Sequence, residues 1–313
     1  MGALIRIVAA RLLQAVMVAV VVGIASFAIV EMLPGDHAYR IAAARYGEDM
    51  ASARAAETVR VELGLDRPWP VRLAVWLGQI ATFDLGVSLV SGEDVVEELK
   101  LQLGATIGLS LLALGLSAFI GLPLGVVMAL RGGAFDKLGL VAAAAVRATP
   151  AYLIGLALML VIAVHWGWLP AAGYDSAAAW PLPAATLAIG LAAMSMMVTR
   201  DAVSRVVMRA DTNFARTKGL AEGAVLRRHV LRNVAVPVVA YMGVQLVWLV
   251  EGVVVVESLF AWPGIGHALV HAVVARDVPM IQGAALAMGL LFVALNAAVD
   301  ALCLALDPRG RRE

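Results

Sequence analysis

The chain has 313 residues, of which 62% are hydrophobic and 15% are charged, and its net charge is +1. Ordinary soluble domains contain roughly 45–50% apolar and about 25% charged residues. The composition therefore excludes a soluble globular protein and indicates one that crosses a membrane several times. The net charge does not point to nucleic acid, and we expect no nucleic-acid partner. A single cysteine, Cys303, excludes a disulfide framework and a cysteine-based metal site.

Six apolar stretches are long enough to cross the membrane as helices, which takes about 20 residues each. They cover residues 8–31, 103–130, 138–164, 180–199, 234–256 and 280–306. Irregular backbone facing lipid would leave its amides unpaired, so each stretch is predicted to be helical. The first stretch is too long for a signal peptide, and no small-residue cleavage site follows it before Pro34, so we interpret it as a retained anchor. The predicted fold is an all-α polytopic membrane protein with six transmembrane helices, forming a single transmembrane domain over residues 1–313.

The connection after the first span, residues 34–102, is predicted to form a small helical cap outside the cytoplasm. Helical spacing of apolar residues occurs at 48–63 and again at 71–80, where Trp69 and Trp76 suit a membrane interface. The charged residues of 93–102 alternate with Val and Leu, which predicts a further helix lying on the outer surface before the second span. A solvated loop is the alternative.

Lysine and arginine are unevenly distributed among the loops, and this asymmetry predicts the orientation. The 200–233 connection carries seven arginines and Lys218, the 131–137 turn carries Arg131 and Lys137, and 165–179 has neither arginine nor lysine. Basic residues concentrate in the cytoplasmic loops of membrane proteins. We therefore expect both termini to face the cytoplasm.

The 200–233 connection also contains a small-residue pattern that charge alone does not explain. Gly219 can adopt the positive φ that a tight helix exit requires, and Pro237 stands where the next segment is expected to begin. Ala215 would permit close approach of a partner, and Arg216 and Lys218 would orient it by charge. The alternative is that these basic residues only follow the general distribution of charge in membrane proteins.

Several motifs follow one another along the chain in a recognisable order. They are Leu33-Pro34-Gly35-Asp36, Leu63-Gly64-Leu65-Asp66-Arg67-Pro68, Asp84-Leu85-Gly86, Gly121-Leu122-Pro123-Leu124-Gly125, Trp168-Leu169-Pro170, Ala215 and Gly219 with Pro237, Glu257 to Gly266, and Asp307-Pro308-Arg309. The ordered set resembles the permease subunits of binding-protein-dependent ABC importers for dipeptides, oligopeptides or nickel. His37 departs from the family pattern, which has Pro at that position.

The resemblance implies a role for the 200–233 connection and a set of partners. Residues 200–233 would be a cytoplasmic coupling loop in which Ala215, Arg216, Lys218, Gly219, Leu220 and Pro237 transmit motion from an ATPase. The partners would be a homologous second permease, two ABC ATPase subunits, an extracytoplasmic substrate-binding protein and membrane lipid. The location would be the bacterial cytoplasmic (inner) membrane.

No phosphate-binding Gly-x-x-x-x-Gly-Lys-Ser/Thr loop occurs in the sequence, and the cytoplasmic loops are too short for a nucleotide-binding domain. We therefore expect a non-catalytic transport subunit that binds no cofactor itself. ATP and Mg²⁺ would be bound by the partner ATPase subunits.

Glu251 lies inside the fifth apolar stretch, where an ionisable side chain is costly and commonly marks a pathway or a partner contact. We interpret it as a candidate translocation-pathway residue that contacts a cationic part of the cargo. The alternative is a structural carboxyl group that forms a local hydrogen bond.

Other functions remain open at this point. His267 and His271 have the i,i+4 spacing of a chelating pair, but the sequence offers no third ligand, and no metal site is predicted. The same architecture could import nickel or another small solute instead of peptides. A secondary transporter or channel would show inverted repeats, which are not visible here, and a membrane enzyme would need convergent catalytic groups.

Overall fold

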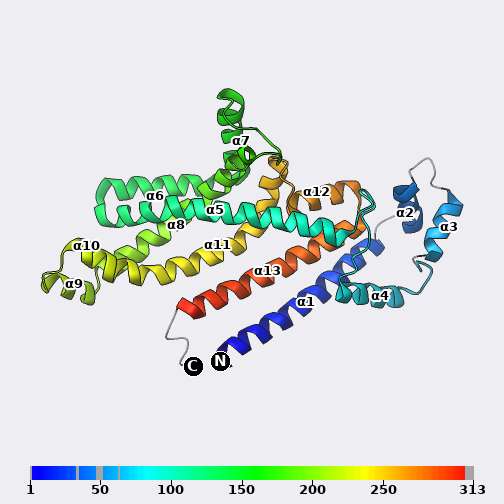
Figure 1. Ribbon diagram of the computed structural model, residues 1–313, viewed down its shortest axis with the longest axis horizontal. Helices are drawn as coiled ribbons and strands as arrows, with labels where there is room; N and C mark the ends of the chain where they lie inside the picture. Colours follow the sequence, from blue (N-terminus) through cyan, green and yellow to red (C-terminus); the bar gives the residue numbers. More distant parts are fainter. Residues whose placement is uncertain (1, 33–34, 47–51, 63, 307–313) are drawn as a thin grey trace. The chain divides into compact units, whose positions relative to one another are not determined.

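The structure is a computed structural model that describes residues 2–32, 35–46, 52–62 and 64–306 (Figure 1). Within these ranges the regular structure is helical apart from one isolated bridge between Val87 and Asp94, which confirms the all-α prediction. The helices are α1 (Gly2–Met32), α2 (His37–Tyr46), α3 (Ala53–Glu62), α4 (Trp69–Thr82), α5 (Val95–Arg131), α6 (Gly133–Ala148), α7 (Ala151–Leu158), α8 (Pro181–Val207), α9 (Ala210–Thr217), α10 (Glu222–Val225), α11 (Arg232–Leu259), α12 (Ile265–Ala275) and α13 (Val278–Leu306).

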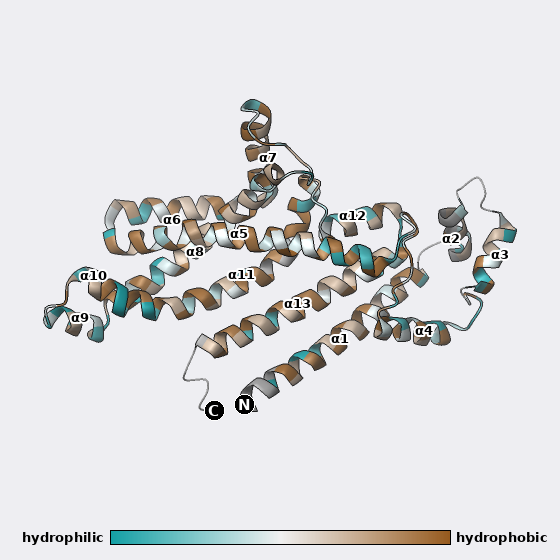
Figure 2. Cartoon of the chain, in the orientation of Figure 1, coloured by the Kyte–Doolittle hydropathy of each residue, from teal (hydrophilic) through white to brown (hydrophobic). Residues whose placement is uncertain are grey.

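Five helical stretches of the described chain are long and apolar enough to cross a membrane. They cover Val8–Met32, Val95–Arg131, Ala177–Val207, Glu222–Val247 and Val278–Ala305. A sixth span exists if α6 and α7, with the π-helical segment Met159–His165 that continues α7, are counted together. Figure 2 shows the apolar character of the long helices and the polar residues that gather around α9 and α10.

The third predicted span, residues 138–164, is not one straight helix. α6 ends at Ala148, α7 begins at Ala151, and the two axes are bent by 98°. The cause is Pro150, which lacks an N–H group and disfavours helical dihedrals in the preceding residue. Thr149 accordingly takes an extended conformation, with φ of −92° and ψ of 122°.

The outer surface helix predicted at 93–102 is not a separate element. α5 begins at Val95 and continues without a break to Arg131. Asp94 caps its first turn by accepting hydrogen bonds from the Val96 and Glu97 amides at 2.8 and 3.2 Å. No proline or tight turn separates 95–102 from the following apolar residues, so helix propagation continues. At about 1.5 Å per residue, α5 is roughly 55 Å long and exceeds the hydrocarbon core.

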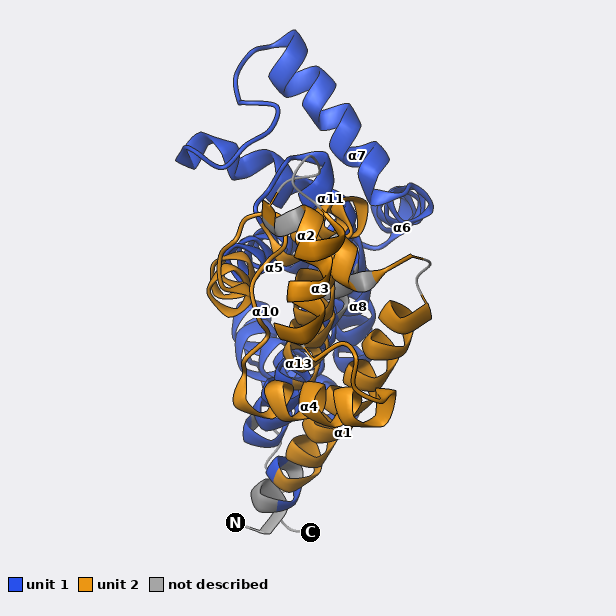
Figure 3. Ribbon diagram, turned by 90° about the vertical axis from the view of Figure 1, so that its right-hand side faces the viewer, with its two compact units in different colours: residues 1–8, 105–263, 294–313 blue, residues 9–104, 264–293 orange. Residues whose placement is uncertain are grey.

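The chain divides into two compact units (Figure 3). One consists of residues 1–8, 105–263 and 294–313, and the other of residues 9–104 and 264–293. In the first unit α8 packs against both α6 and α11. Its largest core cluster includes the fully buried Phe260 and Trp262, at the end of α11.

Two glycines allow α5 and α8 to approach each other closely in the first unit. A Cβ atom added to Gly121 would lie 2.7 Å from the Ala192 carbonyl oxygen, and one added to Gly125 would lie 2.5 Å from that of Met196. The spacing of the two glycines places both on one face of α5. Small residues at this spacing let helix backbones pack closely inside membranes, where the hydrophobic effect between helices is absent.

A buried chain of polar side chains connects α5, α8 and α11. Ser117 and Ser195 have their hydroxyl oxygens 3.1 Å apart, and the Ser195 hydroxyl donates to Gln245 Oε1 at 2.9 Å. The Gln245 amide then donates to the Leu191 carbonyl oxygen at 2.9 Å. Because each of these groups has a partner, the three helices are held in a defined register without leaving a polar atom unsatisfied in an apolar surrounding.

The second unit contains the helices that follow α1. α2 and α3 pack on each other through four buried residues, Ala38, Ala42, Ala56 and Val59. α3 and α4 correspond to the helices predicted at 48–63 and 71–80, although residues 47–51 lie outside the described part of the chain. A separate cluster joins α4 and the start of α5 to α12 and α13, with Val95 and Ile265 fully buried.

Candidate coupling site

Three short helical segments connect α8 to α11 in the first unit. They are α9, α10 and a π-helical segment, Leu226–Leu231, which leads directly into α11. The fully buried Thr212 donates its hydroxyl to the Val206 carbonyl oxygen at 2.8 Å. This bond holds α9 against the last turn of α8, so the position of α9 follows that of a predicted transmembrane helix.

α9 ends in a glycine cap that contains five of the residues singled out in the sequence. The Leu220 amide donates to the Ala215 carbonyl oxygen at 3.3 Å, and the Gly219 amide donates to that of Arg216 at 2.9 Å. These two bonds define a Schellman motif in which Lys218 is the cap residue and Gly219 has φ of 80°. Ala215 is the third residue from the end of α9, and Gly219 is the left-handed residue that follows the cap residue. The Ala-x-x-x-Gly spacing is therefore the spacing that a Schellman motif requires. The positive φ expected at Gly219 is present.

Arg216 is used within the loop. Its Nε donates to Glu222 Oε1 at 2.9 Å, and its Nη1 donates to Asn213 Oδ1 at 3.0 Å and to the Val207 carbonyl oxygen at 3.4 Å. The guanidinium therefore ties α9 to the start of α10 and to the end of α8. Because Glu222 is largely exposed, this pair contributes geometry more than stability.

Phe214 is the large apolar side chain exposed on α9, and Lys218, the cap residue after the helix, is exposed beside it, whereas Ala215 is buried. Phe214 is 60% exposed, and the Lys218 ammonium lies over its ring, 4.6 Å from the centroid. An exposed aromatic ring on a polar loop is typical of a protein contact. Phe214 is not among the residues to which the sequence assigned a role. Its apolar character among polar neighbours was the available signal.

Pro237 does not mark the start of the next segment. α11 begins at Arg232, and Pro237 lies inside that helix. The prediction was wrong because α10, the π-helical segment and α11 follow one another without a non-helical residue. A proline inside a membrane helix is tolerated where neighbouring groups satisfy the carbonyl that loses its partner.

Glu251 belongs to the backbone of α11, but its side chain lies outside the described part of the structure. Its predicted place in a translocation pathway stays a prediction.

His267 and His271 face each other on α12, with ring centroids 4.4 Å apart. Burial lowers the pKa of His267, and the neighbouring His271 lowers it further. A neutral imidazole is the form that binds metals. Among the residues that the structure describes, no group of three His, Cys, Asp or Glu side chains is placed to hold a metal ion.

Residues 121–312 match the family described as "Binding-protein-dependent transport system inner membrane component". The chain belongs to this family. It is 38% identical over 310 residues to a putative peptide transport system permease protein of Brucella abortus (strain 2308), with 96% of this chain and 97% of the relative covered. It is likewise 38% identical over 302 residues to the glutathione transport system permease protein GsiC of Pectobacterium atrosepticum, with the same coverage.

The fold is also similar to a solved structure titled "Crystal structure of an amino acid ABC transporter with histidines". The TM-score is 0.50 at 19% identity, and the likeness covers 66% of this chain and 93% of the other. At this identity the likeness shows a shared fold and nothing more.

Family membership makes the chain an ABC importer permease, a multi-pass membrane subunit without catalytic activity of its own. Permeases of binding-protein-dependent systems work with a substrate-binding protein and an ATPase.

We predict that Gly219→Val disrupts the end of α9 in this permease, whereas Gly223→Val does not. An added side chain meets no atom within 4 Å at either position, but only Gly219 has a positive φ. A left-handed conformation costs a non-glycine residue about 1–2 kcal/mol, and a β-branched one more. The measurement is ATPase activity stimulated by substrate in the assembled transporter, normalised to inserted permease. Equal activity in the two variants would contradict a role for the cap.

Proposed function

We propose that this permease forms one half of the translocation pathway of an ATP-driven peptide importer. Its partner in the membrane would be a homologous, non-identical permease, and the cargo would be a di- or oligopeptide delivered by an extracytoplasmic substrate-binding protein. Relatives that are similar over nearly the whole chain are named as peptide and glutathione permeases, which supports peptides as the cargo. Import of nickel or another small solute is the alternative outcome of the transport assay.

The observation that carries the proposal is the arrangement of α9. The helix is tied to α8 by Thr212, closed by the cap at Gly219 and exposes Phe214 beside Lys218. A short rigid helix with one exposed aromatic ring can insert into a cleft of a partner and transmit its motion. We assign it as the coupling helix that contacts one of two ABC ATPase subunits, which bind the ATP and Mg²⁺.

The roles of the individual coupling residues follow from their contacts. Ala215, Gly219 and Leu220 supply the cap, Arg216 braces α9 against α10, and Lys218 offers a positive charge beside Phe214. Pro237 lies in the first turns of α11, where the loop passes into a membrane helix.

The whole chain, residues 1–313, would act as a single permease domain in the bacterial cytoplasmic membrane. Residues 34–102 would form the extracytoplasmic cap and residues 200–233 the cytoplasmic coupling loop, with both termini in the cytoplasm. The uneven distribution of lysine and arginine supports this orientation.

We expect Phe214→Ala to weaken binding of the ATPase without destabilising the permease. The ring is mostly exposed, so its removal leaves no cavity, but an aromatic anchor at an interface commonly contributes about 2 kcal/mol or more to binding. The measurement is the amount of ATPase subunit that co-purifies with the inserted permease, followed by peptide uptake. Gly223→Ala, in the same loop, is the control. Retention of the ATPase at the level of the unchanged protein would remove Phe214 from the interface.

The orientation can be tested by cysteine labelling in a Cys303→Ser background. A cysteine at Ser176 should react with an impermeant thiol reagent added to intact cells, while one at Ala221 should react only after permeabilisation. The opposite pattern would reverse the orientation and move the coupling loop to the wrong side of the membrane.

Glu251 is proposed to face the translocation pathway and attract a cationic part of the peptide. Glu251→Gln keeps the shape of the side chain and removes its charge, so we expect lower uptake with unchanged assembly and ATP hydrolysis. The assay compares uptake of a peptide with a free amino terminus and the same peptide with that terminus acetylated. Unchanged uptake of both would exclude a substrate contact, and loss of assembly would indicate a subunit interface.

A further inference from the structure

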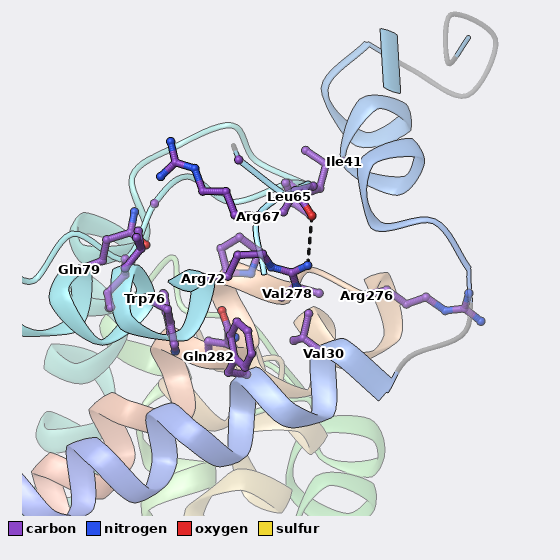
Figure 4. Close-up of a pocket in the computed structure, with 17 residues that line it drawn as sticks. Val30, Ile41, Leu65, Arg67, Arg72, Trp76, Gln79, Arg276, Val278 and Gln282 are labelled. Atoms are coloured by element: carbon purple, nitrogen blue, oxygen red, sulfur yellow. Dashed lines mark hydrogen bonds between the residues drawn. The ribbon is translucent and has the colours of Figure 1, made fainter. Parts of the chain in front are cut away.

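The second unit contains a cavity of about 290 Å³ beside the end of α1 (Figure 4). Phe27 and Val30 of α1, Trp76 of α4, and Val278 and Pro279 of α13 supply apolar walls. The volume is close to the lower limit for small-molecule sites. It is large enough for part of one hydrocarbon chain.

The cavity lies beside the ends of two helices that are long and apolar enough to cross a membrane. Phe27 and Val30 belong to the last two turns of α1, and Val278 and Gln282 to the first two turns of α13. An ion pair between Arg72 and Glu31, in the last turn of α1, marks the polar side of this boundary. α4 exposes Trp69, Val71 and Val75, as expected of a helix lying in the interface.

The rim of the cavity is positively charged. Arg67, Arg72 and Arg276 line it, and among the described lining residues there is no carboxylate. Arg72 is already engaged, since it pairs with Glu31, donates to the Leu65 carbonyl oxygen at 3.2 Å and lies 5.7 Å from the Phe27 ring centroid. In the part of the chain that the structure describes, the guanidinium groups of Arg67 and Arg276 have no hydrogen-bond or ion-pair partner.

Arg276 is held at the rim by strained backbone. It has φ of 58°, a left-handed conformation that costs a side chain other than glycine about 1–2 kcal/mol. The Asp277 amide bonds the Ala272 carbonyl oxygen at 2.8 Å, and the Asp277 carboxylate accepts from the buried Ser88 hydroxyl at 2.5 Å. These bonds fix the turn and therefore the position of the Arg276 Cα atom, from which the side chain extends.

We propose that this cavity binds one acyl chain of an anionic phospholipid, whose phosphate pairs with Arg67 or Arg276. The apolar walls match the chain, and the unpaired arginines match the phosphate of a headgroup at the same depth. Figure 4 shows Arg67 and Arg276 on opposite sides of Arg72, so the two arginines without a partner flank the one that is already paired. The acyl chain of a zwitterionic lipid would fit the apolar walls equally well, but its headgroup would interact less favourably with the arginines of the rim.

Photocrosslinking tests this assignment with the full-length permease in mild detergent. The probe is phosphatidylglycerol with a photoactivatable group in one acyl chain, and crosslinked peptides are mapped by mass spectrometry. We expect crosslinks at 27–30, 75–79 or 278–282. Arg67→Gln/Arg276→Gln should reduce them about thirtyfold, because each basic residue near a membrane surface contributes about 1 kcal/mol to binding of anionic lipid and the variant removes two. Arg54→Gln, an exposed arginine of α3 that does not line the cavity, should have no effect.

A second pair of variants tests the apolar walls independently of charge. Val30→Phe fills the cavity and should also reduce crosslinking at these positions, whereas Val20→Phe, on an exposed face of the same helix, should not. Three results would overturn the proposal. They are equal labelling of all variants, equal labelling by the phosphatidylcholine analogue, and loss of labelling when excess soluble glycerol phosphate is added. The last result would indicate a site for a free anion.

Discussion

The constraint on which this structure depends is that the last carbonyl groups of a helix have no partner within the helix and need a donor from elsewhere. The chain meets it repeatedly with turns that contain one left-handed residue. Gly219 closes α9, Phe83 closes α4 and Arg276 closes α12, each with a paired set of amide-to-carbonyl bonds. These turns determine where each helix stops and which residues stand at the boundary, so the coupling loop and the lipid cavity both depend on them.

The difference among these turns is informative. Glycine adopts a left-handed φ without strain, whereas Phe83 and Arg276 do so at a cost that neighbouring contacts must offset. The turn at Arg276 is anchored by the buried Ser88 and Asp277 pair. The turn at Gly219 lies in an exposed loop. A Cβ atom added to Gly219 would have no atom within 4 Å, so no buried contact surrounds this position. At Gly219 the left-handed conformation thus arises without strain, whereas at Arg276 the buried pair beside it holds the turn.

Hydropathy was sufficient to predict the all-α fold and the approximate position of the long helices, since burying backbone in lipid leaves few other choices. It could not predict the bend at Pro150, because the residues on both sides of the break are equally apolar. Hydropathy also separated 93–102 from the second span, because a change from charged to apolar residues resembles the boundary of an element. In the structure α5 continues through this change. Local turn chemistry, and not hydropathy, determines these boundaries.

At the coupling site the sequence indicated which residues matter but not how each one acts. The Ala-x-x-x-Gly spacing correctly located the cap, because that spacing follows from backbone geometry. It did not show that Arg216 turns inward to Glu222, which depends on the position of α10. Thr212 holds α9 against α8, and Arg216 holds it against α10. A force applied at Phe214 would then pass through α10 to the π-helical residues 226–231, the one part of the path with irregular helical hydrogen bonding. If α9 is the coupling helix proposed above, the compliance that coupling requires would be located there, between α9 and α11.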